Sequence, residues 1–227
     1  MNKLKIAFSI LVVLVAIYLL KKNQINQLLF VQKSKVKIEF YPKTLDSIKL
    51  IKNKLKGKST DIIGKEFVNV LTDKIFPYWY GTNWDFNGTT QKPNEGKIAC
   101  GYFVTTTLKQ VGLDINRIKL AQCASEEMIT TIVSKENVYR FSNKTIEYFE
   151  KSLEKIGNGI YIVGLDNHTG FVLISNDGNY FIHSSGIPPY QVVKDKLSES
   201  SLIVNSKYRV VGNLSTDKKL LLKWTKN

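Results

Sequence analysis

Three side chains in this sequence have the types and the chain order that thiol catalysis uses, and Cys100 is the first of them. It stands in "KIACGYFVTTTLKQVGL", residues 97–113, just before apolar residues that recur every three or four positions up to Gly112. This spacing predicts an amphipathic helix with Cys100 at its N-terminus. Unpaired N–H groups and the helix dipole favour an anion there, which predicts a lowered thiol pKa. The alternative is a core thiol, because free cysteine is among the most buried residue types.

The only two histidines of the chain, His168 and His183, fall in two consecutive apolar runs, "HTGFVLIS" and "NYFIHSS". The runs are joined by "SNDGN", which predicts a hairpin. A four-residue loop over 174–177 would place His168 opposite His183, with Cβ atoms about 5 Å apart. A two-residue loop over 177–178 would instead place His183 opposite Val172, about 13 Å from His168 along the strand. The register therefore decides whether the two rings touch.

The order of cysteine, histidine and a second polar side chain predicts a division of roles. Cys100 would be the nucleophile, His168 would take and deliver its proton, and His183 would fix the orientation of the first ring. Cys123, in "AQCASEEM", is expected to be structural, because Ser125 predicts a helix cap and no basic residue stands beside the thiol. A disulfide between the two cysteines would block the nucleophile, and we expect none.

Composition excludes several other classes of protein. The two cysteines and two histidines lack the close pairs of a zinc site, so no metal or other cofactor is expected. The net charge of +14 comes from 33 basic against 19 acidic residues spread along the chain. Without zinc-finger spacing or an RNA-binding aromatic strand, this surplus predicts a basic solvated surface and no nucleic-acid partner.

The elements that must position the three side chains indicate an α+β fold. Helices are expected in "SIKLIKNKLKGKS", ending near Gly57, in "DIIGKEFVNVLTDKI", and in "SNKTIEYFEKSLEKIG", capped by Ser142. The segment 76–96 has no period and predicts an ordered loop. The two histidine runs, with "GIYIVGLD" and "YRVVGNL", predict an antiparallel meander packed against the Cys100 helix.

The N-terminus predicts contact with a membrane. Lys3 and Lys5 precede an apolar run over 6–20, and Lys21 and Lys22 follow it, so residues 1–23 form an anchor or a signal segment. No small-residue cleavage pattern follows, which favours an uncleaved hydrophobic anchor helix with the domain outside the cytoplasm, periplasmic or on the cell surface. Cleavage would make the protein secreted. Residues 24–58 are expected to form a basic linker with a short helix, and 59–227 one catalytic domain.

Four short segments in the same order resemble a known family of enzymes. "PYWYGT", "ACGYFV", "HTGFVLI" and "YFIHSS" are similar to the Tyr-x-Trp-Gly-Gly, Asp-Cys-Ser-Gly-Phe-Val, His-Val-Gly-Ile-Tyr and Phe-Val-His-Ala segments of NlpC/P60 cysteine peptidases. The resemblance covers about residues 60–190. It implies a papain-like α+β core with Cys100, His168 and His183 as the catalytic triad. It also implies that Tyr78 lies near the oxyanion pocket, and Tyr80 and Trp84 are expected beside it at the substrate.

The resemblance further implies hydrolysis of an amide bond in peptidoglycan stem peptides. The sequence departs from the family pattern at Ala99, Gly101 and Thr82, where the family usually has Asp, Ser and Gly. The interval between Cys100 and His168 is expanded by the segment 123–141, so the substrate pocket is expected to differ. There are three alternatives. The protein could be a CHAP-like amidase, another acyl-transfer relative, or an inactive binding domain of the same fold that uses its aromatic loop as a ligand surface. The oligomeric state is left open.

Overall fold

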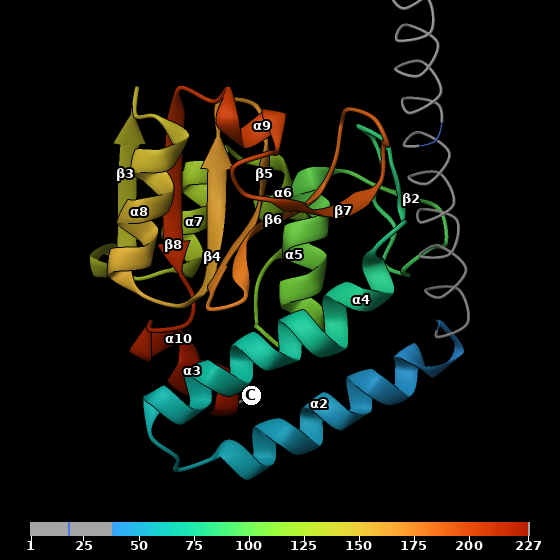
Figure 1. The fold of residues 1–227 in the computed structure, drawn as a ribbon. Helices are drawn as coiled ribbons and strands as arrows, with labels where there is room; N and C mark the ends of the chain where they lie inside the picture. The colour runs from blue at the N-terminus through green and yellow to red at the C-terminus, as the bar shows by residue number, and fades with distance from the viewer. Residues whose placement is uncertain (1–17, 19–37, 227) are drawn as a thin grey trace, which may run out of the picture.

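A six-stranded antiparallel sheet with helices on both faces forms the centre of the molecule (Figure 1). The computed structural model describes Tyr18 and residues 38–226. The strand order is β3-β8-β4-β5-β6-β7. The bounds of the strands are β3 Val138–Ser142, β4 Gly159–Leu165, β5 Thr169–Ser175, β6 Gly178–Ser184, β7 Val192–Lys196 and β8 Tyr208–Asn213. The α+β class expected from the sequence is confirmed.

The strand pairing corrects the expected meander. β4, β5 and β6 follow one another as expected, but β7 (Val192–Lys196) comes next, and β8 (Tyr208–Asn213) crosses back to pair with β4. The two strands that the sequence did not reveal, β3 and β7, are the edges of the sheet. Inner strands covered on both faces are continuous apolar runs, whereas these edge strands are short and half polar. Their sequence signal is correspondingly weak.

One face of the sheet is covered by α5 (Cys100–Gln110) and α7 (Ser125–Ile132). The same core continues into the helices drawn below the sheet in Figure 1, which are α2 (Tyr41–Leu55), α3 (Thr60–Asn69), the π-helical turn η2 (Val70–Ile75), α4 (Phe76–Trp79) and α10 (Lys218–Lys226). Part of the predicted loop over 76–96 is therefore helical. The rest holds β1 (Asn83–Trp84), which pairs in parallel with β2 (Lys97–Ile98) just after the loop. The short 3-10 turns η1 (Ile38–Phe40) and η3 (Lys135–Asn137) complete this part of the chain.

The helix α2 belongs to the same core as the rest of the molecule. Its Tyr41 hydroxyl donates to Gln110 Oε1 (2.5 Å) and accepts from Trp79 Nε1 (2.9 Å), and Ile48 is 1% exposed. These contacts join α2 to α4 and α5. The folded body therefore includes Tyr41–Leu55, instead of beginning at residue 59 after a linker.

The opposite face of the sheet is covered by α8 (Ile146–Ile156) and the short α9 (Ser201–Val204). The side chain of Thr145, not of Ser142 as predicted, accepts the N-terminal N–H of α8, because Ser142 pairs in β3. The guanidinium of Arg209 in β8 is buried here and donates to the carbonyl oxygens of Ile203 (2.9 Å) and Val204 (2.9 Å). It thereby holds the end of α9 against the sheet.

The chain after α5 forms two short helices, of which α6 (Arg117–Gln122) packs on α5 and α7 packs on β4 and β8. α6 lies so close that a Cβ added to Gly101 would stand 2.5 Å from the carbonyl oxygen of Ala121. A serine at position 101 would therefore clash with this carbonyl. Ala124, and not Ser125, is the N-cap residue of α7, and Ser125 is its first residue.

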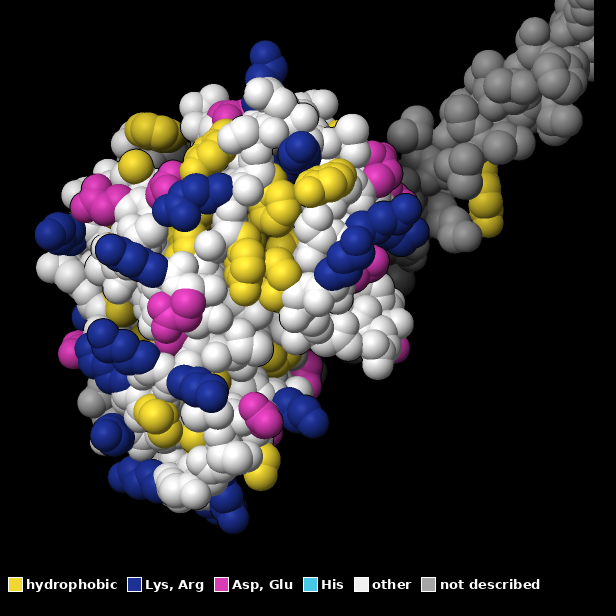
Figure 2. All heavy atoms as spheres, turned by 90° about the vertical axis from the view of Figure 1, so that its left-hand side faces the viewer, with side chains coloured by type: hydrophobic (Ala, Val, Ile, Leu, Met, Phe, Trp, Pro, Cys, Tyr) yellow, Lys and Arg dark blue, Asp and Glu magenta, His cyan; other side chains and the backbone are white. Residues whose placement is uncertain are grey.

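The predicted anchor over 6–20 lies outside the described residues, apart from Tyr18, and stays a prediction. Among the helices that the structure describes, none is long and apolar enough to cross a membrane. Figure 2 shows Lys and Arg side chains scattered among acidic and uncharged ones on the face around β3 and α8. On this face the positive charge is dispersed and forms no continuous band.

Candidate active site

Backbone and side-chain hydrogen bonds fix Cys100 at the first turn of α5. The N–H of Ala99 donates to the carbonyl oxygen of Gly88 (2.8 Å), and Ser184 Oγ in β6 donates to the carbonyl oxygen of Ile98 (2.7 Å). Ser184 follows His183 directly in the chain. The same strand therefore carries one histidine and also holds the residues that precede the cysteine.

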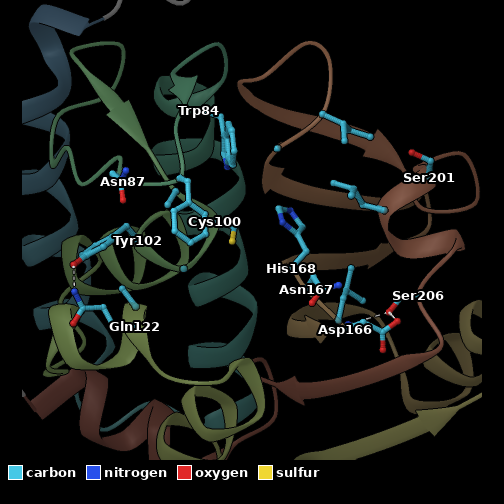
Figure 3. A pocket seen from close by; sticks show the side chains of 18 of the residues that line it. Trp84, Asn87, Cys100, Tyr102, Gln122, Asp166, Asn167, His168, Ser201 and Ser206 are labelled. Atoms are coloured by element: carbon cyan, nitrogen blue, oxygen red, sulfur yellow. Dashed lines mark hydrogen bonds between the residues drawn. The ribbon is translucent and has the colours of Figure 1, made fainter.

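Cys100 opens into a cavity of about 900 Å³, shown in Figure 3. One wall is formed by the helical side, with Tyr102 and Gln122, whose Nε2 donates to the Tyr102 hydroxyl at 3.1 Å. The opposite wall comes from the β4–β5 loop, with His168, and from α9. Figure 3 shows the Cys100 sulfur turned toward the His168 ring across this cavity. The structure thus brings these two predicted residues to one site.

The two histidines are in direct contact, through a register that differs from both predicted ones. Ser175 pairs with Gly178, so the hairpin loop is Asn176–Asp177, and His183 falls opposite Gly170. His168 lies just before β5, on the diagonal from His183. Its Nε2 is 2.9 Å from His183 Nδ1, with the ring planes at 89°. Ring side chains at diagonal positions on one face of a sheet can contact each other, as directly opposed side chains do.

Gly170 makes room for this pair. A Cβ at position 170 would lie 2.8 Å from the Cβ of His183 and 2.7 Å from a ring carbon of Phe181. The rings of Phe181 and His183 are stacked with centroids 4.0 Å apart. Even an alanine methyl would therefore push the His183 ring out of position, since so close an approach of carbon atoms is strongly repulsive.

Beyond His183 the chain of hydrogen bonds continues to residues that the sequence reasoning missed. His183 Nε2 lies 3.1 Å from Asp195 Oδ2 in β7, and Ser200 Oγ donates to the same oxygen at 3.0 Å. Asp195 pairs with Phe181 and is therefore diagonal to His183 as well. An acidic residue in the strand after the second histidine was the available signal, but β7 itself was not recognised.

The Cys100 helix and the histidines lie on opposite faces of the sheet, contrary to the expected geometry. α5 packs on the face of Phe171 and Ile182, whereas His183 shares the other face with Phe181. Cys100 approaches His168 at the N-terminal end of β5, where the backbone N–H of Thr169 donates to the sulfur. Among the described residues no hydrogen bond joins Cys100 to His168 directly. Free enzymes commonly show such looser contacts before substrate binds.

The electrostatics of the site keep both reacting groups uncharged at rest. Burial raises the pKa of the Cys100 thiol, although the N–H groups of Thr169, Gly101 and Cys100 itself oppose that rise. The expectation of a lowered thiol pKa is therefore wrong, because desolvation outweighs these donors. Burial and the neighbouring His183 lower the pKa of His168 to about 3. Both groups are therefore neutral in the resting site, and proton transfer from the thiol to the imidazole is disfavoured there.

Asp195 supplies the negative charge of the site. Burial alone would raise the pKa of its carboxyl group, but the hydrogen bonds from His183 and from the Ser200 hydroxyl hold it below its ordinary value. Burial lowers the pKa of His183, opposed by Asp195. The structure therefore holds a neutral His183 against an ionised Asp195.

The three aromatic residues expected at the substrate divide into one that reaches the cavity and two that do not. Trp84 lines the cavity above Cys100 (Figure 3). The Tyr78 hydroxyl points to α2, where it shares a hydrogen bond with Thr44 Oγ1 (2.9 Å), and its ring lies 4.8 Å from that of Tyr41. Tyr80 is buried and borders a different cavity. Neither tyrosine lines the cleft that contains Cys100.

Both cysteines are free thiols. Cys123 Sγ donates to the carbonyl oxygen of Leu120 (3.4 Å), and burial, with the charge of Glu127, raises its pKa. This agrees with a structural role, although Cys123 and Cys100 both border a small cavity of about 190 Å³ beside the main one. Within the part of the chain that the structure describes, no cluster of His, Cys, Asp and Glu is suited to hold a metal ion.

Comparison with known proteins identifies no relative. No family model matches the chain, and neither the search of curated proteins nor that of solved structures gives a match. The functional argument therefore rests on the residues of the cleft and their geometry.

Proposed function

We propose that this protein is a cysteine hydrolase with a papain-like core of the NlpC/P60 type, which cleaves an amide bond through Cys100, His168 and His183. The observation that carries the proposal is the 2.9 Å contact of the two imidazoles at the edge of the cavity that also holds the Cys100 sulfur. A thiol, an imidazole and an orienting group in this order are the parts that nucleophilic acyl transfer needs.

The reaction follows from the positions of these groups. His168 takes the thiol proton as Cys100 Sγ attacks the amide carbon, and it then gives the proton to the departing amine. The product is a thioester on Cys100. Water, deprotonated by the same ring, attacks the thioester, releases a carboxylic acid and restores the thiol. Because both groups are neutral at rest, charge develops only when a substrate is in place.

The oxyanion of the tetrahedral intermediate needs donors near the sulfur. The N–H of Cys100, in the first turn of α5, has no partner within the helix and is one such donor. Tyr78 cannot be the second, because its hydroxyl faces α2. Trp84 takes that place in our proposal, since its indole borders the cavity and, within the described part of the chain, its ring N–H makes no hydrogen bond.

The cleft suits a peptide with uncharged polar groups. Side-chain amides of Asn87, Gln122, Asn167 and Asn205 line it, and the aromatic rings of Trp84 and Phe86 form its rim. Phe86 is 80% exposed, which leaves its ring free to contact a substrate. We propose peptidoglycan stem peptides as the substrate class because the four sequence segments resemble those of NlpC/P60 peptidases, and we propose that the protein is anchored through residues 6–20 with its domain outside the cytoplasm.

Digestion of purified peptidoglycan by the full chain in detergent tests this proposal. We expect new amino termini within the stem peptides, detected by mass spectrometry of the released fragments, and none from a Cys100→Ala chain. Absence of any cleavage by the wild-type chain would contradict the proposed substrate.

Labelling with a thiol-reactive probe separates the alternatives. In a Cys123→Ser chain the label reports only on Cys100. Labelling without peptidoglycan cleavage would favour a CHAP-like amidase or another acyl-transfer relative with the same thiol and imidazole. Because the pKa of the Cys100 thiol is raised, labelling is measured at several pH values up to alkaline ones. Neither labelling at any of them nor cleavage would favour a binding domain that uses the rim of Trp84 and Phe86.

A further inference from the structure

We infer that Asp195 is a positioning residue of this site, which fixes the tautomers of both imidazoles so that Nδ1 of His168 is the nitrogen that receives the Cys100 proton. This inference rests on the proposed function for its catalytic meaning, but the tautomers themselves are a property of the resting protein. It adds a fourth member, and with Ser200 a fifth, to the three residues expected from the sequence.

The first step concerns His183. A carboxylate oxygen only accepts hydrogen bonds, so the 3.1 Å contact of Asp195 Oδ2 with His183 Nε2 places the ring proton on Nε2. His183 is neutral, because burial lowers its pKa. Its Nδ1 then carries a lone pair and can only accept.

The second step passes the assignment to His168. Since His183 Nδ1 accepts, the 2.9 Å contact requires the proton on His168 Nε2. The remaining nitrogen, Nδ1 of His168, is left with a lone pair. A base needs a free lone pair, so only this tautomer allows His168 to take a proton from the thiol.

Without Asp195 the opposite arrangement would satisfy the same two rings. His183 Nδ1–H would donate to His168 Nε2, and His168 would then present Nδ1–H, which cannot accept a proton. The contact between the histidines alone therefore does not select the active tautomer. The carboxylate selects it, as the orienting carboxylate of a serine-protease triad does for a single ring.

One further contact, which is itself supported by α9, holds Asp195 in place. Ser200 Oγ donates to the oxygen that faces His183, and Ser200 directly precedes α9, whose last carbonyls accept from the buried Arg209. Lys194, Lys196 and Glu199 border the same outer cavity as Asp195, of about 880 Å³. The charged groups on that side are thus two cations and one further anion.

Asp195 acts through His183 and does not border the substrate cavity. It is absent from the lining of the 900 Å³ cleft, and His183, which separates it from His168, is 1% exposed. We therefore expect a change at Asp195 to lower kcat with little effect on KM. A residue that contacts substrate would change KM as well.

The test is ¹⁵N NMR of the imidazole nitrogens at neutral pH. It compares the full chain carrying Cys100→Ala with the same chain that also carries Asp195→Asn. We expect both rings as the Nε2–H tautomer with Asp195, and a mixture or the Nδ1–H form in the variant. Asp177→Asn, which removes an exposed carboxylate from the β5–β6 loop, is the matched control and should leave the tautomers unchanged.

An Nδ1–H tautomer at His183 in the chain with Asp195 would overturn the inference, whatever the activity. The same holds if Asp195→Asn leaves both tautomers unchanged. In the Cys100-containing enzyme we expect Asp195→Asn to lower kcat on the order of 10- to 100-fold with KM within about twofold. Correct tautomers in a chain that cleaves no amide would instead refute the proposed function and leave the assignment of the protons intact.

Discussion

The two walls of the cleft are organised in opposite ways. On the sheet side His168, His183, Asp195 and Ser200 form one continuous series of hydrogen bonds from the cavity to the outer surface. On the helical side Cys100 has no hydrogen-bonded side-chain partner within the described residues, and only backbone N–H groups approach its sulfur. In the proposed mechanism the base is therefore oriented by side-chain hydrogen bonds, whereas the nucleophile has only backbone contacts.

In the proposed mechanism, this difference means that proton transfer from Cys100 to His168 begins only when substrate binds. The thiol pKa is raised and that of His168 is lowered, so the ion pair of thiolate and imidazolium is disfavoured in the empty site. Such a pair would form as the substrate carbonyl arrives and the oxyanion donors come into use. A site of this kind keeps its thiol protonated, and so less reactive, while it is empty.

Removal of either reacting group should have the largest effect. We expect Cys100→Ala and His168→Ala each to abolish turnover, by at least about 10³-fold, while the domain stays folded. The double variant should lose no more than either single one, because the thiol and its base act as a unit. Steady-state rates and circular dichroism of the three chains measure this, with Cys123→Ala as the control. A His168→Ala enzyme of near-normal rate would remove this ring from the mechanism.

A methyl group at position 170 should disrupt the sheet side of the site without replacing any member of the proposed triad. We expect Gly170→Ala to lower the rate by more than about tenfold and the free energy of unfolding by roughly 1–3 kcal/mol, because its Cβ would displace the His183 ring. Gly212→Ala in β8 meets Ile129 at a similar 2.8 Å, far from the cleft, and is the matched control.

Thermal unfolding and steady-state rates of the two glycine variants test whether the loss of activity comes from the His183 position or from the sheet as a whole. Gly212→Ala should lose stability and keep its activity. Equal loss of activity in both variants would mean that the sheet as a whole, and not the His183 position, limits the site.

On the helical side the effect of a single donor should be smaller. We expect Trp84→Phe to lower kcat roughly 10- to 100-fold, because the ring is kept and only the indole N–H is lost. Tyr78→Phe should change kcat little, since that hydroxyl bonds to Thr44 in α2. The reverse ranking of the two variants in steady-state kinetics would return the oxyanion role to Tyr78.

The smallest effect concerns stability and pH. The pKa of His168 is about 3 in the folded protein and about 6.5 in an unfolded chain, so the unfolded state binds the additional proton between these values. The free energy of unfolding should therefore fall as the pH is lowered from about 6.5, by at most about 1.4 kcal/mol per pH unit for this ring. Urea unfolding of the wild-type chain and of His168→Ala from pH 7 to 4 measures it. Equal slopes would show that His168 does not carry the proton difference.

The sequence predicted the parts of this site that lie on strongly patterned elements. The helix that begins at Cys100 and the two inner strands beside the histidines have long apolar runs, and their approximate places were predicted correctly. The register of the hairpin was predicted wrongly, because "SNDGN" fits loops at 176–177, 177–178 or 174–177 equally well. Asp195 could not be found, since it belongs to an edge strand whose alternating pattern extends over only five residues.

Tyr78 was misplaced for a different reason. Its segment is similar to a family motif, but residues 76–79 continue the helical layer, and that turn directs the hydroxyl toward α2. A motif of four or five residues gives the residue types without the direction in which each side chain points. The direction depends here on α2, which the sequence analysis had assigned to a linker.

The anchoring of α9 by Arg209 has a consequence for how this protein can change in evolution. α9 is only four residues long. Arg209, in the strand β8 beside β4, holds it through two backbone carbonyl oxygens, which any residue provides. Of the side chains of α9 that border the cleft, Leu202 also packs against the core on this face of the sheet, whereas Ser201 can vary without loss of the helix. We expect diverging descendants of this gene to alter the cleft at Ser201 first, while the codon for Arg209 is kept.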